Sequence, residues 1–122
     1  MRNSAIVLSS IVLLTLGAAS AAAHHSAVMF DFSQSVEVEG VVKGFRVANP
    51  HTRLFLEVTD ERGTREIEYE GHSRNNFYRA GWRPEKGRVG EKMTVFIAPR
   101  RDGKDGGYIT AFVTADGEKI GF

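Results

Sequence analysis

Apolar side chains recur at every second position through most of residues 36–114, which is the spacing of strands buried on one face. The first alternating run extends from residue 36 to about residue 47. Gly40 and Gly44 lie inside it, where a strand can bulge or bend sharply because glycine carries no side chain. The pattern therefore predicts a mainly β domain that begins with a long, bent strand.

Breaks in the alternation divide the rest of the chain into further strands. Asn49 and Pro50 end the first run, because proline has no amide hydrogen and keeps the preceding residue out of a helix. The later runs cover residues 54–58, 65–70, 93–98 and 108–114. Residues 60–63 have the composition of a hairpin loop that ends on a glycine. Residues 118–122 form a short tail that can pair with a neighbouring strand.

A short helix is predicted between the third and fourth strands. Ser73 is a suitable N-cap, and the helix would extend to about Ala80. Phe77 and Ala80 would then face the interior, and Gly81 would end the helix. Trp82 follows at once and is large enough to close one end of a core.

The order of three strands, a short helix and two strands is that of a five-stranded OB-like Greek-key barrel. A small open β-sandwich with the same strands is the alternative, because periodicity alone does not separate the two folds. We expect residues 34–122 to form this single domain, since about a hundred residues suffice for one core. Residues 24–33 are expected to be a flexible segment before it.

Residues 1–23 have the three parts of a secretory signal peptide. Arg2 supplies a positive start, residues 6–16 are mostly apolar, and a run of small residues leads to cleavage after Ala22 or Ala23. The apolar run is too short for a stable membrane span. We therefore expect a periplasmic protein, with full secretion as the alternative, and no membrane span once the leader is removed.

Composition narrows the function further. The chain has no cysteine, which excludes disulfides, thiolate metal sites and cysteine nucleophiles. Its formal net charge is +1, and Arg2 is the only charged residue before His24, so the mature chain is formally neutral. Nucleic acids and anionic lipids attract clustered Lys and Arg, so we expect no nucleic-acid partner. Glycine-rich phosphate loops and nucleophile elbows are absent from the sequence, and we do not expect an enzyme.

Histidines are the best candidate metal ligands of the chain. Cleavage after Ala22 would place His25 third, where an amine, backbone amides and an imidazole can surround Cu(II) in a plane. Cleavage after Ala23 would make His24 the first residue, and its amine and imidazole could chelate copper with His25 or His51. The alternative is that the His24-His25 pair is only a polar start of the chain and that His51 fixes a loop.

Other candidate residues carry weaker signals. His72 precedes the predicted helix and is expected to be an exposed loop residue. Glu66, Glu68 and Glu70 alternate along the third strand and could hold a hard cation, but such a row is usually a solvated face. Their spacing therefore favours a structural interpretation over a metal site.

Four short motifs together resemble a family of small exported bacterial proteins catalogued as domain of unknown function 6152. The motifs are His24-His25-Ser26, Asn49-Pro50-His51, Gly81-Trp82 and Ala115-Asp116-Gly117. The resemblance covers nearly all of the mature chain and implies export and this fold, but it supplies no reaction. It also implies that His24, His25 and His51 belong to one feature, with Asn49, Pro50 and Trp82 as structural motif residues.

The sequence thus favours a non-enzymatic exported module that binds a small ligand or a periplasmic protein. The most specific version of this hypothesis is a module that binds a copper-type ion at His24, His25 and His51. The alternative is a structural or protein-interaction barrel of the periplasm that binds no metal and uses a sheet edge or the barrel mouth.

Overall fold

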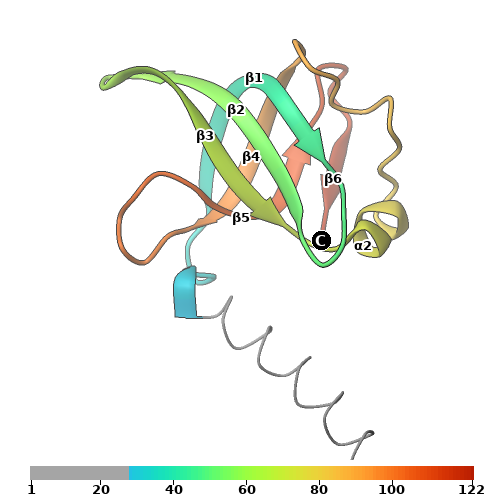
Figure 1. Cartoon of the computed structure of the whole chain (residues 1–122), viewed down its shortest axis with the longest axis horizontal. Coiled ribbons are helices and arrows are strands. Elements are labelled where there is room, and N and C mark those ends of the chain that lie inside the picture. Colours follow the sequence, from blue (N-terminus) through green and yellow to red (C-terminus); the bar gives the residue numbers. More distant parts are fainter. Residues whose placement is uncertain (1–27) are drawn as a thin grey trace, which may run out of the picture.

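The computed structural model describes residues 28–122, and the elements in this part follow the predicted order (Figure 1). They are β1 (Val36–Arg46), β2 (Thr52–Asp60), β3 (Gly63–Gly71), α2 (Arg74–Arg79), β4 (Lys92–Pro99), β5 (Gly107–Val113) and β6 (Lys119–Gly121). The strand ends differ from the predicted ones by at most two residues. The short tail is a true strand, β6, that pairs with β5.

The strands form a closed barrel with the topology of an OB-fold. Their order in the sheet is β3-β2-β1-β4-β5-β6, and a parallel contact between Glu70 of β3 and Tyr108 of β5 closes the barrel. The first strand is shared by both halves, because residues 36–41 pair with β4 and residues 41–46 pair with β2. With the helix between β3 and β4, this arrangement confirms the predicted five-stranded OB-like barrel.

The core contains most of the alternating apolar residues of the strands, whereas Val36, in phase with Val38 and Val42 at the start of β1, is exposed. The largest fully buried side chains are Phe77, Phe112, Leu54, Leu56, Ile109, Ile120, Val42, Val95 and Thr52. Helix α2 covers one end of the barrel in Figure 1 and contributes Phe77 to this core. Trp82 follows the helix and is also buried, and its indole Nε1 donates a hydrogen bond to the backbone oxygen of Lys86 at 2.9 Å.

Helix α2 begins as the sequence predicts. Ser73 is its N-cap, and the Ser73 hydroxyl accepts a hydrogen bond from the backbone N–H of Asn76 at 3.5 Å. Gly81 follows with a φ of +99°, a conformation that favours glycine and turns the chain toward Trp82. Within residues 28–122, no helix is long and apolar enough to cross a membrane.

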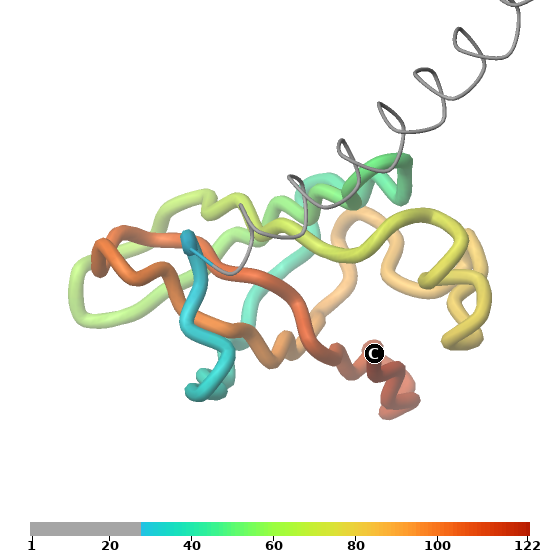
Figure 2. The backbone as a smooth tube through the Cα atoms, turned by 90° about the horizontal axis from the view of Figure 1, so that it is seen from below, coloured from blue at the N-terminus to red at the C-terminus, as the bar shows by residue number. Residues whose placement is uncertain are grey.

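The segment before β1 packs against the barrel. Phe30 is buried against Ala98 and Tyr108, and it forms an isolated β-bridge with Arg100. Two backbone hydrogen bonds, from Asp31 N–H to the Pro99 oxygen at 2.8 Å and from Arg101 N–H to the Met29 oxygen at 2.9 Å, extend this contact. Figure 2 shows the segment beside the end of β4.

The expected flexible segment through residue 33 thus has contacts with the barrel at residues 29–31, where an aromatic side chain and backbone hydrogen bonds attach it. His24 and His25, in the same predicted segment, lie outside the described residues.

One buried hydroxyl of the core has no hydrogen-bond partner within residues 28–122. Thr52 is 0% exposed, and its Oγ1 is unpaired, although its backbone N–H donates to the His72 oxygen at 3.0 Å. A buried hydroxyl without a partner is costly, because it has lost its hydrogen bonds to water.

We therefore expect Thr52→Val to raise the free energy of unfolding by about 1 kcal/mol, since valine keeps the shape and removes the unpaired group. Urea denaturation followed by tryptophan fluorescence measures the change. Thr52→Ser, which keeps the hydroxyl and removes the methyl group, should lower the same free energy. A loss of stability in Thr52→Val would contradict this account of the hydroxyl.

Candidate functional site

The loop between β1 and β2 places His51 at the edge of the barrel. The Asn49–Pro50 peptide bond in this loop is cis. The Asn49 Oδ1 accepts a hydrogen bond from the Arg74 backbone N–H at 3.1 Å, and the Arg74 Nε donates to the Val47 oxygen at 3.3 Å. These hydrogen bonds hold the loop against the start of α2. His51, the last residue of the loop, therefore has a fixed position directly before β2.

Hydrogen bonding defines which nitrogen of His51 carries a proton. The Nδ1 of His51 lies 3.3 Å from the Gly71 backbone oxygen and 3.3 Å from the Glu70 Oε1. Both partners are acceptors, so we assign the proton to Nδ1, which then donates to them. In the neutral ring, Nε2 then keeps its lone pair. The His51 side chain is 30% exposed and that of Glu70 is 18% exposed, so the pair is partly shielded from water.

His72 lies beside this pair, which the sequence did not predict. The ring of His72 packs against the rings of Tyr108 and Phe122, with centroids 5.1 and 5.0 Å away. Burial lowers the pKa of His72 below its usual value, and the positive charge of protonated His51 lowers it further. His72 is therefore half-buried rather than an exposed loop residue, and its neutral form is favoured.

Tyr108 completes the group at the seam between β3 and β5. Burial raises the pKa of Tyr108 to about 12, and the negative charge of Glu70 adds to this effect. The phenol is thus protonated at neutral pH. We refer to His51, Glu70, His72 and Tyr108 as the histidine cluster.

As metal ligands, the histidine cluster contains two imidazoles and the Glu70 carboxylate, which already contacts His51. Within residues 28–122, no group of three or more His, Asp or Glu side chains is arranged to hold a metal ion. A metal bound at His51 would therefore need ligands from elsewhere, and His24 and His25 lie outside the described residues. Both cluster imidazoles are metal ligands only when neutral, which the lowered pKa of His72 favours.

The row of glutamates on β3 is divided among separate contacts. Glu68 forms an ion pair with Arg53 at 2.5 Å, and Glu70 contacts His51. Glu66 is exposed and has no ion pair within residues 28–122. A cavity of about 280 Å³ lies along this face of β3, and Phe30 and Arg100 form part of its lining. The three carboxylates therefore do not converge on one cation.

Together, the barrel topology and the histidine cluster define a small OB-like β-barrel domain with a pair of histidines at its β3–β5 seam. The family model described as "Family of unknown function (DUF6152)" matches residues 12–110. The chain belongs to this family, as its four short motifs indicated.

The comparisons with solved structures and with curated proteins say less about this chain than the family model does. A solved chain described as "Crystal structure of yeast Stn1 and Ten1" is similar to this one at 16% sequence identity and a TM-score of 0.45. The match covers 66% of this chain and only 42% of the yeast chain. No curated protein matches the sequence significantly.

Proposed function

We propose that the protein is exported to the periplasm and is a non-enzymatic module that binds one copper-type ion through His51, His24 and His25. The observation that supports this proposal most is the orientation of His51. Its Nδ1 donates to Glu70 and to the Gly71 oxygen, so Nε2 is left as the free nitrogen. A histidine that donates its second nitrogen to a carboxylate or carbonyl is typical of metal ligands, because the bond fixes the ring and increases its basicity.

The attachment of the N-terminal segment supports the use of His24 and His25. Phe30 packs on Tyr108 with centroids 5.6 Å apart, and Tyr108 packs on His72 at 5.1 Å. Phe30 therefore contacts the histidine cluster through Tyr108, whose ring lies between Phe30 and His72. An extended chain spans about 3.3–3.6 Å per residue, so the residues from His25 to Met29 are long enough to reach the cluster.

The proposal is tested by metal uptake of the exported protein. Its intact mass first locates the cleavage site, and metal analysis with Cu(II) titration then measures stoichiometry and affinity. We expect about one Cu(II) per chain with nitrogen ligands in the electron paramagnetic resonance spectrum. Replacing His24 and His25 by alanine should abolish uptake, and His51→Ala should weaken it at least about tenfold.

A matched pair of glutamate variants serves as the control. Glu70→Ala removes the acceptor that orients His51, and we expect copper affinity to fall about tenfold. Glu66→Ala removes an exposed carboxylate from the same face of the same strand and should leave affinity unchanged. Equal effects of the two variants would show that general charge, not the orientation of His51, controls binding. No copper uptake by the protein of verified mass would contradict the proposal.

A protein-interaction barrel without metal is the second candidate function. Several large apolar side chains that a core would normally contain are exposed, among them Phe32, which precedes β1, and Val36, the first residue of β1. This function predicts a stable complex on affinity capture from periplasmic extract and no metal in the purified protein.

A further inference from the structure

The barrel has an open edge where β1 passes from one neighbour to the other. Residues 36–40 pair with β4 alone, and residues 58–60 pair with β3 alone. Between these segments, β1 and β2 diverge, and within residues 28–122 no strand pairs with the facing edge of either. The pairing of β1 with β2 begins at Val41, and at Gly40 the two backbones are still close, because a Cβ there would lie only 2.7 Å from the Glu57 backbone oxygen.

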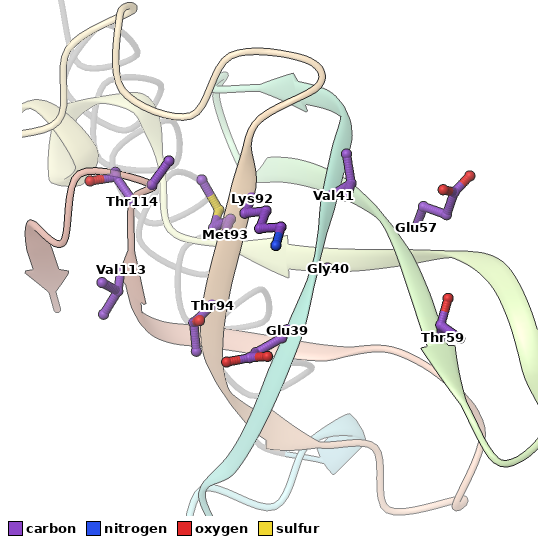
Figure 3. Close-up of a pocket in the computed structure, with 11 residues that line it drawn as sticks. Glu39, Gly40, Val41, Glu57, Thr59, Lys92, Met93, Thr94, Val113 and Thr114 are labelled. Carbon is purple, nitrogen blue, oxygen red and sulfur yellow. The ribbon is translucent and has the colours of Figure 1, made fainter.

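A groove of about 480 Å³ lies at this divergence. Figure 3 shows Glu39 on β1 between Thr59 on β2 and Thr94 on the neighbouring β4, and the groove continues past β4 to Val113 on β5. Its lining is mainly polar side chains, so the groove resembles neither an apolar ligand cavity nor the interior of the barrel. An extended segment placed along β1 would fit beside this groove.

The charges of the open edge indicate what such a segment must carry. Glu37 and Glu39 are exposed on the outer face of β1, and neither forms an ion pair within residues 28–122. By contrast, Glu57 is paired with Lys43 at 3.4 Å. Side chains directly opposite each other on paired strands are about 4.5–5.5 Å apart, so a new strand would place alternate side chains next to Glu37 and Glu39.

A second copy of this chain is a poor occupant of the edge. Antiparallel pairing of two β1 edges would bring Glu37 and Glu39 of one copy close to the same glutamates of the other. Like charges placed opposite each other on neighbouring strands are unfavourable, and charged edges are a known protection against self-association. A segment with lysine or arginine at alternate positions has the complementary charge. Aliphatic residues between them would contact Val36, which is exposed, and Val38, which is half-buried.

We propose that the open edge of β1, residues 36–40, binds an extended segment of a partner protein as an added strand, and that Glu37 and Glu39 select segments with alternating basic residues. Backbone hydrogen bonds along β1 supply affinity in this mode of recognition, and the alternate side chains supply specificity. This binding surface is separate from the histidine cluster, and it does not require a metal.

The test uses a fluorescent eight-residue peptide of alternating valine and lysine with the exported protein. We expect saturable binding in fluorescence anisotropy and, by NMR, amide shift changes concentrated at residues 36–40. The double variant Glu37→Lys/Glu39→Lys should bind this peptide about tenfold more weakly, since two favourable charge pairs become repulsive. The same variant should gain binding of a peptide of alternating valine and glutamate.

A control variant separates local from general charge. Glu61 and Glu85 are exposed glutamates in loops, and Glu61→Lys/Glu85→Lys makes the same change in net charge away from the groove. It should bind the valine–lysine peptide as the unmodified protein does. Equal weakening in both double variants, shift changes on another surface, no binding of the peptide, or dimerisation through residues 36–40 would each overturn the proposal.

Discussion

Replacement of Phe77 by alanine is expected to lower the free energy of unfolding by about 3–5 kcal/mol. Phe77 is 0% exposed and is the one buried residue of α2. It contacts the rings of Phe45, Trp82, Phe112 and Phe122, with centroids 4.6–6.3 Å away. Truncation would remove these contacts and leave a cavity at the end of the barrel that rigid strands cannot fill.

Chemical denaturation with near-UV circular dichroism measures this loss and reports the packing of the aromatic cluster. Tyr78→Ala is the matched control, because Tyr78 is the next residue of the same helix and is 40% exposed. We expect that variant to lose less than about 1 kcal/mol. If Phe77→Ala and Tyr78→Ala were equally stable, α2 would not be held to the barrel by the buried ring.

Local sequence signals were sufficient to predict most of the fold. Strand positions followed from the alternation, because each strand of the barrel has one face in the core and one in solvent. The helix followed from Ser73 and Gly81, whose backbone roles depend only on neighbouring residues. The contact of Phe30 with Tyr108 could not be predicted in this way, because those residues are far apart in sequence and meet only after the barrel closes.

The candidate site was predicted in part. His51 was identified from its place after Asn49 and Pro50, but His72 was assigned to an exposed loop. The pairing of β2 with β3 would have predicted that His72 lies beside His51. Asp60 pairs with Gly63 across the hairpin, and the same register pairs Thr52 with Gly71, so the next position brings His51 opposite His72.

The contacts that bury His72 could not be predicted by counting residues along the paired strands. The burial of His72 depends on Tyr108 from β5 and on Phe122, which come together with β3 through a single parallel contact. A parallel contact between distant strands leaves no periodic signal in the sequence. The protonation of His51 at Nδ1 likewise depends on Glu70 and the Gly71 oxygen, whose positions come from the register of β3.

Gly40 and Gly44 were both predicted as points where β1 bends, and the structure gives them different roles. The register of β1 against β2 shifts between Val42 and Gly44, so Gly44 belongs to a bulge. Gly40 instead allows the backbones of β1 and β2 to approach closely before they separate. A Cβ at Gly40 would meet the backbone of Glu57, whereas one at Gly44 would meet only the side chain of Phe55.

Gly40→Ala is therefore expected to lower the free energy of unfolding by about 2 kcal/mol. The added Cβ would lie 2.7 Å from the Glu57 oxygen and 3.2 Å from the Leu56 Cβ, so β1 or β2 must move. The sign of the change is informative, because replacing glycine by alanine inside a strand otherwise stabilises by roughly 0.5–1 kcal/mol. Gly121→Ala in β6 is the matched control, since its Cβ would meet only the Ala111 Cβ, at 3.8 Å. In urea denaturation, Gly121→Ala should be neutral or slightly stabilising, and equal stabilisation by both variants would exclude a close approach of the two strands at Gly40.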